Sequence, residues 1–128
     1  MPGRVLLDTN VVIAIFSGEK AVSQRITESE VFVSSTVLGE LHYGARKSAH
    51  AAANQARIEE FASSVPVLNC DAATARHYGE IKHHLRSKGR PIPENDIWIA
   101  AAATQYGLSL ATRDDHFKEV DGLRIESW

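Results

Sequence analysis

The chain has 128 residues, 44% of them hydrophobic and 23% charged, which is typical of one globular domain with one buried core. We therefore expect a single domain over residues 1–128, because a second core would need a longer chain. The formal net charge of −2 argues against a protein that coats nucleic acid through bulk positive charge. A local contact with nucleic acid is still possible. If four of the acidic side chains bind a metal ion, the net charge of the remaining side chains is +2 rather than −2.

Cysteine usage and hydropathy indicate the cellular setting. The single cysteine, Cys70, excludes an intrachain disulfide framework and favours a reducing compartment. The longest apolar runs, 11–16 and 97–103, are far shorter than the roughly 20 residues that cross a bilayer. The first residues lack the basic and apolar regions of a secretion signal. We therefore expect a cytoplasmic protein with no membrane contact.

Strand and helix patterns alternate along the chain. Short β-favouring runs predict strands at residues 4–7, 31–33, 67–68, 108–111 and 123–125. A helix is expected to begin at Val11, and apolar stripes of helical period lie within 37–45, 58–65, 72–85 and 97–104. Strands that alternate with helices pair in parallel through right-handed crossovers. The sequence therefore predicts a three-layer α/β/α fold with a mainly parallel central sheet.

Local signals define some helix ends. Asp71 is a suitable N-cap for the helix over 72–85, and the run 88–91 (KGRP) supplies a cation, a glycine and a proline that end it. The alanine-rich segment 48–54 predicts the start of a helix rather than a hinge.

Four acids are placed where a ligand site is expected. Asp8 and Asp114 follow predicted strands, and ligands of parallel sheets bind beyond the carboxyl ends of the strands. Asp96 lies in the first turn of a helix predicted over 95–106, and Glu40 flanks the apolar stripe of its own helix. Glu40 therefore needs a partner, because an isolated desolvated carboxylate is costly.

Each acid by itself has a simpler explanation. Asp8 or Asn10 suits a helix N-cap, Asp96 suits a helix dipole, and Asp114 with Asp115 suits a turn. Four converging carboxylates are harder to explain without a cation, because each pair at about 4 Å repels by roughly 4 kcal/mol at a dielectric near 20. A site of oxygen ligands favours Mg²⁺ or Mn²⁺ over Zn²⁺, and such sites hydrolyse phosphate esters.

The acids lie in four segments, in chain order 7–11 (LDTNV), 40–44 (ELHYG), 93–101 (PENDIWIAA) and 111–117 (ATRDDHF). Their order and spacing resemble the four signature motifs of PIN-domain nucleases, and the similarity covers essentially the whole chain. The size resembles that of the VapC-type toxins of bacterial toxin-antitoxin pairs. The resemblance implies a PIN-like fold and an endoribonuclease that cuts single-stranded or structured RNA, such as tRNA or rRNA loops.

The same resemblance assigns roles to individual residues. It implies that Asp8, Glu40, Asp96 and Asp114 hold one or two Mg²⁺ or Mn²⁺ ions, which activate a water for hydrolysis. Asn10 and Thr112 are expected to be supporting polar groups. The family pattern places the fourth acid on Asp114, directly after Thr112 and Arg113, and Asp115 is then a solvated turn residue.

Basic residues near the third motif suggest where RNA binds. The segment 82–90 (KHHLRSKGR) is the densest basic stretch, and Arg86, Lys88 and Arg90 are candidates to follow an RNA backbone. A solvated helix end, with cations that offset the dipole, explains them equally well. Arg113 is a candidate to touch the scissile phosphate or to pair with a site acid.

Partners follow from the resemblance. It implies a homodimer and a VapB-type antitoxin whose tail lies in the active-site groove and delivers a basic residue to the acids. It also implies that DNA is bound only through the antitoxin.

Two other functions remain open on the sequence. An acid-site phosphotransfer domain also places an Asp after the first strand, but the haloacid-dehalogenase type needs a second Asp where this chain has Asn10. The response-regulator type normally needs two adjacent acids near that strand and a lysine on a later strand of the sheet. The other alternative is a non-catalytic binding partner with an acidic pocket. Six histidines without a metal-binding spacing give little support to a zinc enzyme.

Overall fold

The structure is a computed structural model that describes residues 3–128, so the first two residues of the predicted domain lie outside the described part. Five strands form one sheet in the order β3-β2-β1-β4-β5, and every pair is parallel. The strands are β1 (Arg4–Leu7), β2 (Glu30–Ser34), β3 (Val67–Leu68), β4 (Ser109–Thr112) and β5 (Ile125–Ser127). The helices are α1 (Thr9–Phe16), α2 (Lys20–Thr27), α3 (Ser35–Lys47), α4 (Ala51–Ser64), α5 (Ala72–Ser87) and α6 (Glu94–Tyr106), and a 3₁₀ helix, η1 (Asp115–Glu119), follows β4.

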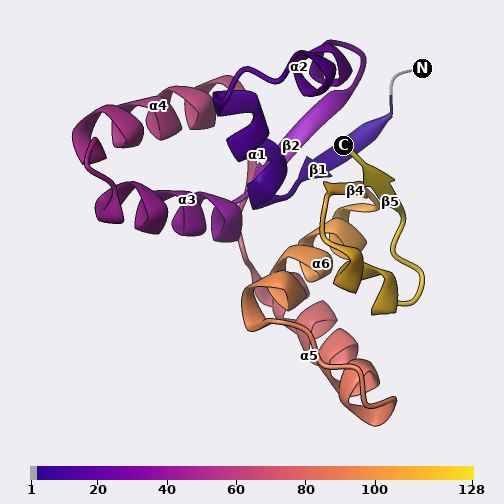
Figure 1. Ribbon diagram of the computed structural model, residues 1–128. Helices are drawn as coiled ribbons and strands as arrows, with labels where there is room; N and C mark the ends of the chain where they lie inside the picture. Colours follow the sequence, from indigo (N-terminus) through magenta and orange to yellow (C-terminus); the bar gives the residue numbers. More distant parts are fainter. Residues whose placement is uncertain (1–2) are drawn as a thin grey trace.

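The order of the strands places the helices in two layers. From β1 to β3 the chain moves toward one edge of the sheet, and it then crosses back past β1 to β4. Because such crossovers are right-handed, this reversal puts α5 and α6 on the face opposite α1 to α4 (Figure 1). The predicted three-layer α/β/α fold with a parallel sheet is confirmed.

The central strand and α6 form the middle of the core. Leu6 and Leu7 of β1 and Leu110 of β4 are completely buried, as expected for parallel strands covered on both faces. In α6, Ile97, Ile99 and the four alanines that follow are also buried. The small alanines let α6 lie close to the sheet, so its first turn is held firmly at the sheet's end.

Caps fix the helix ends as the sequence indicated. The Asp71 carboxylate accepts a hydrogen bond from Thr74 N, and the Thr74 hydroxyl accepts one from Asp71 N, which forms a reciprocal capping box. Gly89 after α5 has a φ of +68°, which glycine adopts without strain. Ser34 Oγ caps α3 by accepting from Val37 N at 3.2 Å. The Ser34 cap thus fixes the start of α3, the helix that carries Glu40.

Several boundaries differ from those predicted. The helix α2 was not predicted, because only Val22 and Ile26 provide apolar contacts over its eight residues. The strand β5 begins at Ile125 rather than at residue 123, since the Leu123 amide donates to Val120 O in a turn. The helix α4 ends at Ser64, because Val65 precedes a proline and is extended. Among residues 3–128, no helix has the length and apolar character needed to span a membrane.

Candidate active site

Asp8 lies at the end of the central strand, where α1 begins. Its carboxylate accepts hydrogen bonds from Thr9 N at 2.8 Å and from Thr112 Oγ1 at 2.6 Å. Asp8 is therefore both the N-cap of α1 and a buried site acid, with only 2% of its surface exposed. Asp8 therefore caps a helix and also lies near the other acids.

Asp114 lies beside Asp8 because β1 and β4 are neighbours in the sheet. Leu7 pairs with Ala111 in the parallel register, so the next residues of both strands leave the sheet at the same edge. Asp114 N donates to Thr112 Oγ1 at 3.0 Å, and the same hydroxyl donates to Asp8. Thr112 thus connects the two acids through one hydroxyl group.

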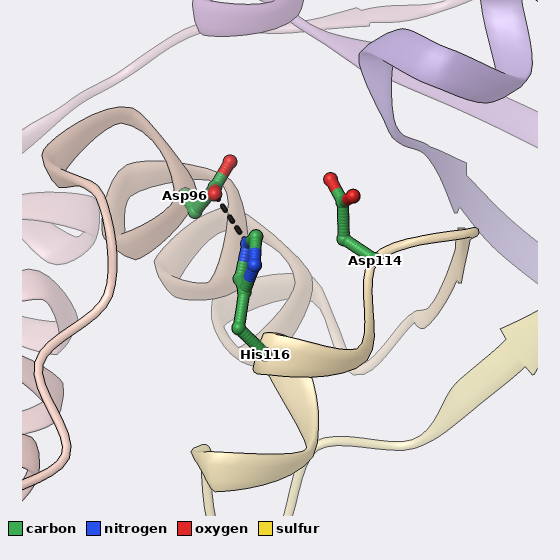
Figure 2. A group of neighbouring side chains, drawn as sticks. All are labelled: Asp96, Asp114 and His116. Atoms are coloured by element: carbon green, nitrogen blue, oxygen red, sulfur yellow. Dashed lines mark hydrogen bonds and ion pairs between the residues drawn. The ribbon is translucent and has the colours of Figure 1, made fainter.

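Asp96 comes from the opposite layer, in the first turn of α6. It is 9% exposed, and its Oδ2 lies 2.5 Å from His116 Nε2 (Figure 2). Figure 2 also shows Asp114 directed toward the same space from the turn after β4. One polar atom each from Asp96, Asp114 and His116 lie within 4.8 Å of one another.

Glu40 reaches the site from α3. The buried side chains of Val37 and Leu41 flank it and hold this face of α3 against the core. Glu40 Oε1 and the neighbouring Thr9 Oγ1 are buried and have no hydrogen-bond partner among residues 3–128. An unpartnered carboxylate oxygen of this kind is the position at which a cation is expected.

The four acids lie close enough to influence one another's ionisation. Burial raises the pKa of Asp8, and repulsion by Asp96 and Asp114 adds to the rise. Burial likewise raises the pKa of Glu40, where Asp96, Asp8 and Asp114 all contribute repulsion. Burial also raises the pKa of Asp96 against the opposing effect of His116. Together with the unpartnered Glu40 oxygen, this donor set fits a divalent cation.

His116 is a site residue that the sequence reasoning missed. It lies in η1, next to the fully buried Phe117, which anchors this turn in the core. The only sequence signal for it was its place two residues after Asp114, at the end of a strand. The sequence analysis considered the six histidines only as possible zinc ligands, so His116 was not singled out.

Asn10 and Arg113 support the loops around the site. Asn10 Oδ1 accepts a hydrogen bond of 3.4 Å from Arg113 N. The Arg113 guanidinium binds both oxygens of Glu19, at 3.1 and 2.7 Å, and the carbonyl of Trp128 at 3.2 Å. Its acidic partner is therefore the N-cap of α2, outside the group of four acids.

Asp115 is solvated in the structure. Its side chain is 90% exposed and pairs with Lys118 at 3.2 Å, one turn away in η1. The acidic doublet therefore divides as the motif suggested, with Asp114 directed into the site and Asp115 directed to solvent.

The predicted RNA-contacting residues lie at and just beyond the C-terminal end of α5. The helices α5 and α6 run antiparallel, because Thr74 contacts Gln105 and Lys82 contacts Glu94. Arg86, Lys88 and Arg90 therefore extend past the first turn of α6. Lys88 lies 3.4 Å from Asp121, and Arg90 lies 3.9 Å from Glu119.

Known proteins share this arrangement. A family model described as PIN domain matches residues 5–123. The chain is 40% identical to the tRNA(fMet)-specific endonuclease VapC of Shigella flexneri and 38% identical to ribonuclease VapC2 of Haemophilus influenzae, in both cases over 98% of each chain. It superposes on the crystal structure of DNA-bound VapBC from Salmonella typhimurium with a TM-score of 0.92, at 35% identity, covering 100% of this chain and 99% of that chain. The chain therefore belongs to the PIN-domain family and is a nuclease of the VapC type.

Proposed function

We propose that this protein is an endoribonuclease that depends on Mg²⁺, or on Mn²⁺ in its place, and that acts as the toxin of a VapBC-type toxin-antitoxin pair. The observation that carries the proposal is the convergence of Asp8, Glu40, Asp96 and Asp114 at one end of the parallel sheet. Three of these acids have raised pKa values from burial, and Glu40 retains an unpartnered buried oxygen. A bound divalent cation would offset the repulsion between the acids and would coordinate the unpartnered Glu40 oxygen.

The site residues would have two roles in hydrolysis, namely to hold the metal ions and to orient the acids. The four carboxylates would hold one or two ions, and Thr112 with the Thr9 amide fixes the orientation of the Asp8 carboxylate. When bound, the divalent ion supplies a water of lowered pKa and offsets the charge that develops on the phosphate. Asn10 holds the turn that carries Asp114 through its contact with Arg113 N.

We propose an RNA substrate in which an unpaired loop enters the acidic site. The Shigella flexneri relative is named for tRNA(fMet), which supports tRNA loops as the first substrate to test, with rRNA loops next. Arg86, Lys88 and Arg90 would follow the RNA backbone on the surface beyond α6. The pairings of Lys88 with Asp121 and of Arg90 with Glu119 are exposed and are therefore weak enough to exchange for phosphates.

The test is cleavage of purified tRNA and rRNA by the purified chain, with Mg²⁺, with Mn²⁺ and with a chelator. Asp8→Asn and Asp96→Asn should abolish cutting and keep the fold, because Asn retains the cap of α1 and the shape of each side chain. Asp115→Asn is the matched control, because it removes a neighbouring acid that is exposed to solvent.

Each outcome assigns a function. Discrete fragments that need the metal and disappear in Asp8→Asn support the nuclease. Intact RNA with both ions would favour the non-catalytic partner with an acidic pocket. Stable labelling of Asp8 by a small phosphodonor would favour the phosphotransfer alternative.

An apolar groove beside Glu40 supports a VapB-type antitoxin as partner. The groove lies between α1, α3 and α4 and has a volume of about 300 Å³. Ile13, Phe16 and Leu41 are among its apolar lining residues. Its polar lining consists of Thr9, Glu40, Asn54 and Arg57. Ile13 is 51% exposed in the chain alone. An antitoxin tail with apolar side chains and one basic residue would fill the groove and place its charge on Glu40.

The groove proposal is tested by neutralisation. Ile13→Glu should prevent the cognate antitoxin from inhibiting RNA cleavage and should leave the cleavage itself intact. Tyr106→Ser, which alters an exposed aromatic residue outside the groove, should leave inhibition unchanged. Full inhibition of Ile13→Glu would place the antitoxin elsewhere.

The remaining proposals concern assembly and location. We propose a homodimer of this single domain, in the cytoplasm, where the exposed Cys70 stays reduced. The solved relatives from Salmonella typhimurium and Rickettsia felis are VapBC proteins bound to DNA. We propose that this chain meets DNA only through the antitoxin, so the isolated chain should give no sequence-specific footprint on operator DNA.

A further inference from the structure

His116 adds a nitrogen atom to the acidic site. Its Nε2 lies 2.5 Å from Asp96 Oδ2, and a polar atom of each residue lies within 4.8 Å of Asp114 (Figure 2). The three residues come from separate elements, namely the first turn of α6, the turn after β4, and η1. Their proximity is therefore a product of the fold rather than of neighbouring positions in one helix.

The position of His116 is well defined. Phe117, which follows it, is completely buried, and the two rings lie 5.0 Å apart. The preceding turn is fixed by the hydrogen bond from Asp114 N to Thr112 Oγ1. The His116 side chain is nevertheless 36% exposed, while that of Asp96 is 13% exposed. An ion can therefore reach the imidazole from solvent.

The separations suit a shared ion. Ligand atoms at about 2.1 Å from one ion lie about 3 Å apart when they are at right angles, and about 4.2 Å apart when they are opposite. The three polar atoms all lie within 4.8 Å of one another, which is close to this range. The Asp96–His116 contact, at 2.5 Å, is shorter than the right-angle separation, so these two atoms would have to move slightly apart around a shared ion.

We propose that His116 is a nitrogen ligand of the ion held by Asp96 and Asp114, and that it shifts the preference of the site from Mg²⁺ toward Mn²⁺ and other first-row transition ions. This inference rests on the proposed metal-dependent function. Mg²⁺ binds oxygen almost exclusively, whereas an imidazole nitrogen suits transition ions. The oxygen-only ligand set predicted from the sequence is thereby extended.

Pulsed electron paramagnetic resonance on the Mn²⁺-loaded protein tests the ligand directly. The parent protein should show modulation from a coordinated nitrogen, and His116→Asn should lose it. The control is His84→Asn, because His84 pairs with Asp121 away from the four acids. Absence of nitrogen modulation in the parent protein, or its persistence in His116→Asn, would overturn the proposal.

Calorimetric titrations with Mn²⁺ and Mg²⁺ separate a ligand from a residue that only positions Asp96. For a ligand, His116→Asn should weaken Mn²⁺ binding by about tenfold or more and Mg²⁺ binding much less. Equal losses for both ions would mean that His116 acts only through its hydrogen bond to Asp96. His116→Gln provides a second variant if the Asn variant folds poorly.

The RNA cleavage assay on the parent protein distinguishes failure of this inference from failure of the proposed function. Nitrogen coordination without any RNA cleavage would leave His116 as a ligand and remove the ribonuclease. Metal-dependent cleavage without nitrogen coordination would support the ribonuclease and would exclude His116 as a metal ligand.

Discussion

Thr112 Oγ1 donates a hydrogen bond of 2.6 Å to Asp8 Oδ2 and accepts one of 3.0 Å from the backbone amide of Asp114. A single buried hydroxyl thus fixes the carboxylate at the end of β1 and the turn that follows β4. Both strands contribute an acid to the site, so the geometry of the pair depends on a residue that has no charge of its own.

Thr112→Val should therefore be destabilising. Valine keeps the shape of threonine but leaves the buried Asp8 with the Thr9 amide alone, and a hydrogen bond to a charged group contributes about 1.5–3 kcal/mol. We expect the free energy of unfolding at pH 7 to fall by about this amount in urea denaturation. Thr112→Ser keeps the hydroxyl and should lose much less. Equal losses for the two variants would show that the methyl group, and not the hydrogen bond, is important.

The pH dependence of the free energy of unfolding should reveal the raised pKa values of the buried acids. The pKa values of Asp8, Glu40 and Asp96 lie above their ordinary values, chiefly through burial. Between the unfolded and folded values the folded state holds more protons, so the free energy of unfolding falls as the pH rises through this window. The window opens at the ordinary values, 3.8 for Asp and 4.5 for Glu, and extends upward.

Asp8→Asn isolates this effect, because the exposed ion pairs are the same in both proteins. In chelator at pH 7 the variant should be more stable than the parent protein, by about 1.4 kcal/mol for each unit by which the pKa of Asp8 is raised. The difference should shrink as the pH falls toward 4. Urea denaturation over this pH range measures it, and a difference that does not vary with pH would contradict the assignment.

Divalent ions should stabilise the protein. An ion that binds only the folded state adds about 2.7 kcal/mol at a hundred times its dissociation constant. Mg²⁺ and Mn²⁺ should therefore raise the Tm of the parent protein, and Asp96→Asn should lose most of the increase. Asp115→Asn should respond like the parent protein, since its side chain is 90% exposed. A Tm that stays constant across the titration would show that the acids do not form a preformed metal site.

The pair between Arg113 and Glu19 is expected to hold the Asp114 turn indirectly. The pair ties the residue before Asp114 to the start of α2, and it lowers the pKa of Glu19 through the hydrogen bonds from Arg113. Arg113→Gln and Glu19→Gln should each reduce the cleavage rate modestly, and the double variant should be no slower than either. A double-mutant cycle on the cleavage rate checks this coupling. Strictly additive losses would favour a direct contact between Arg113 and the phosphate.

The layers of the fold and three of the site acids followed from local patterns. Buried parallel strands produce dense apolar runs, as in residues 4–7, so β1 could be placed within the chain. Asp8 and Asp114 follow such runs, and parallel strands end at the same edge of a sheet. Asp96 could be placed on the first turn of a helix. What no single segment encoded was that the carboxylates face one another, which depends on the strand order.

Other features depended on contacts that the sequence does not display. The helix α2 has little apolar surface and is held by its packing against the rest of the domain. The nitrogen of His116 approaches Asp96 only because η1 turns back over the start of α6. Arg113 was expected near the phosphate or a site acid, but the position of Glu19 beside it depends on α2, which was not predicted.

The place of β1 between β2 and β4 also has a consequence for synthesis of the protein. The strand carrying Asp8 is translated about a hundred residues before its neighbour β4, which brings Thr112 and Asp114. A nascent chain that stops before β4 has Asp8, Glu40 and Asp96 but lacks Asp114 and the hydroxyl that orients Asp8. A chain of this fold thus acquires its complete set of acids only after β4 and the turn that follows it have been made.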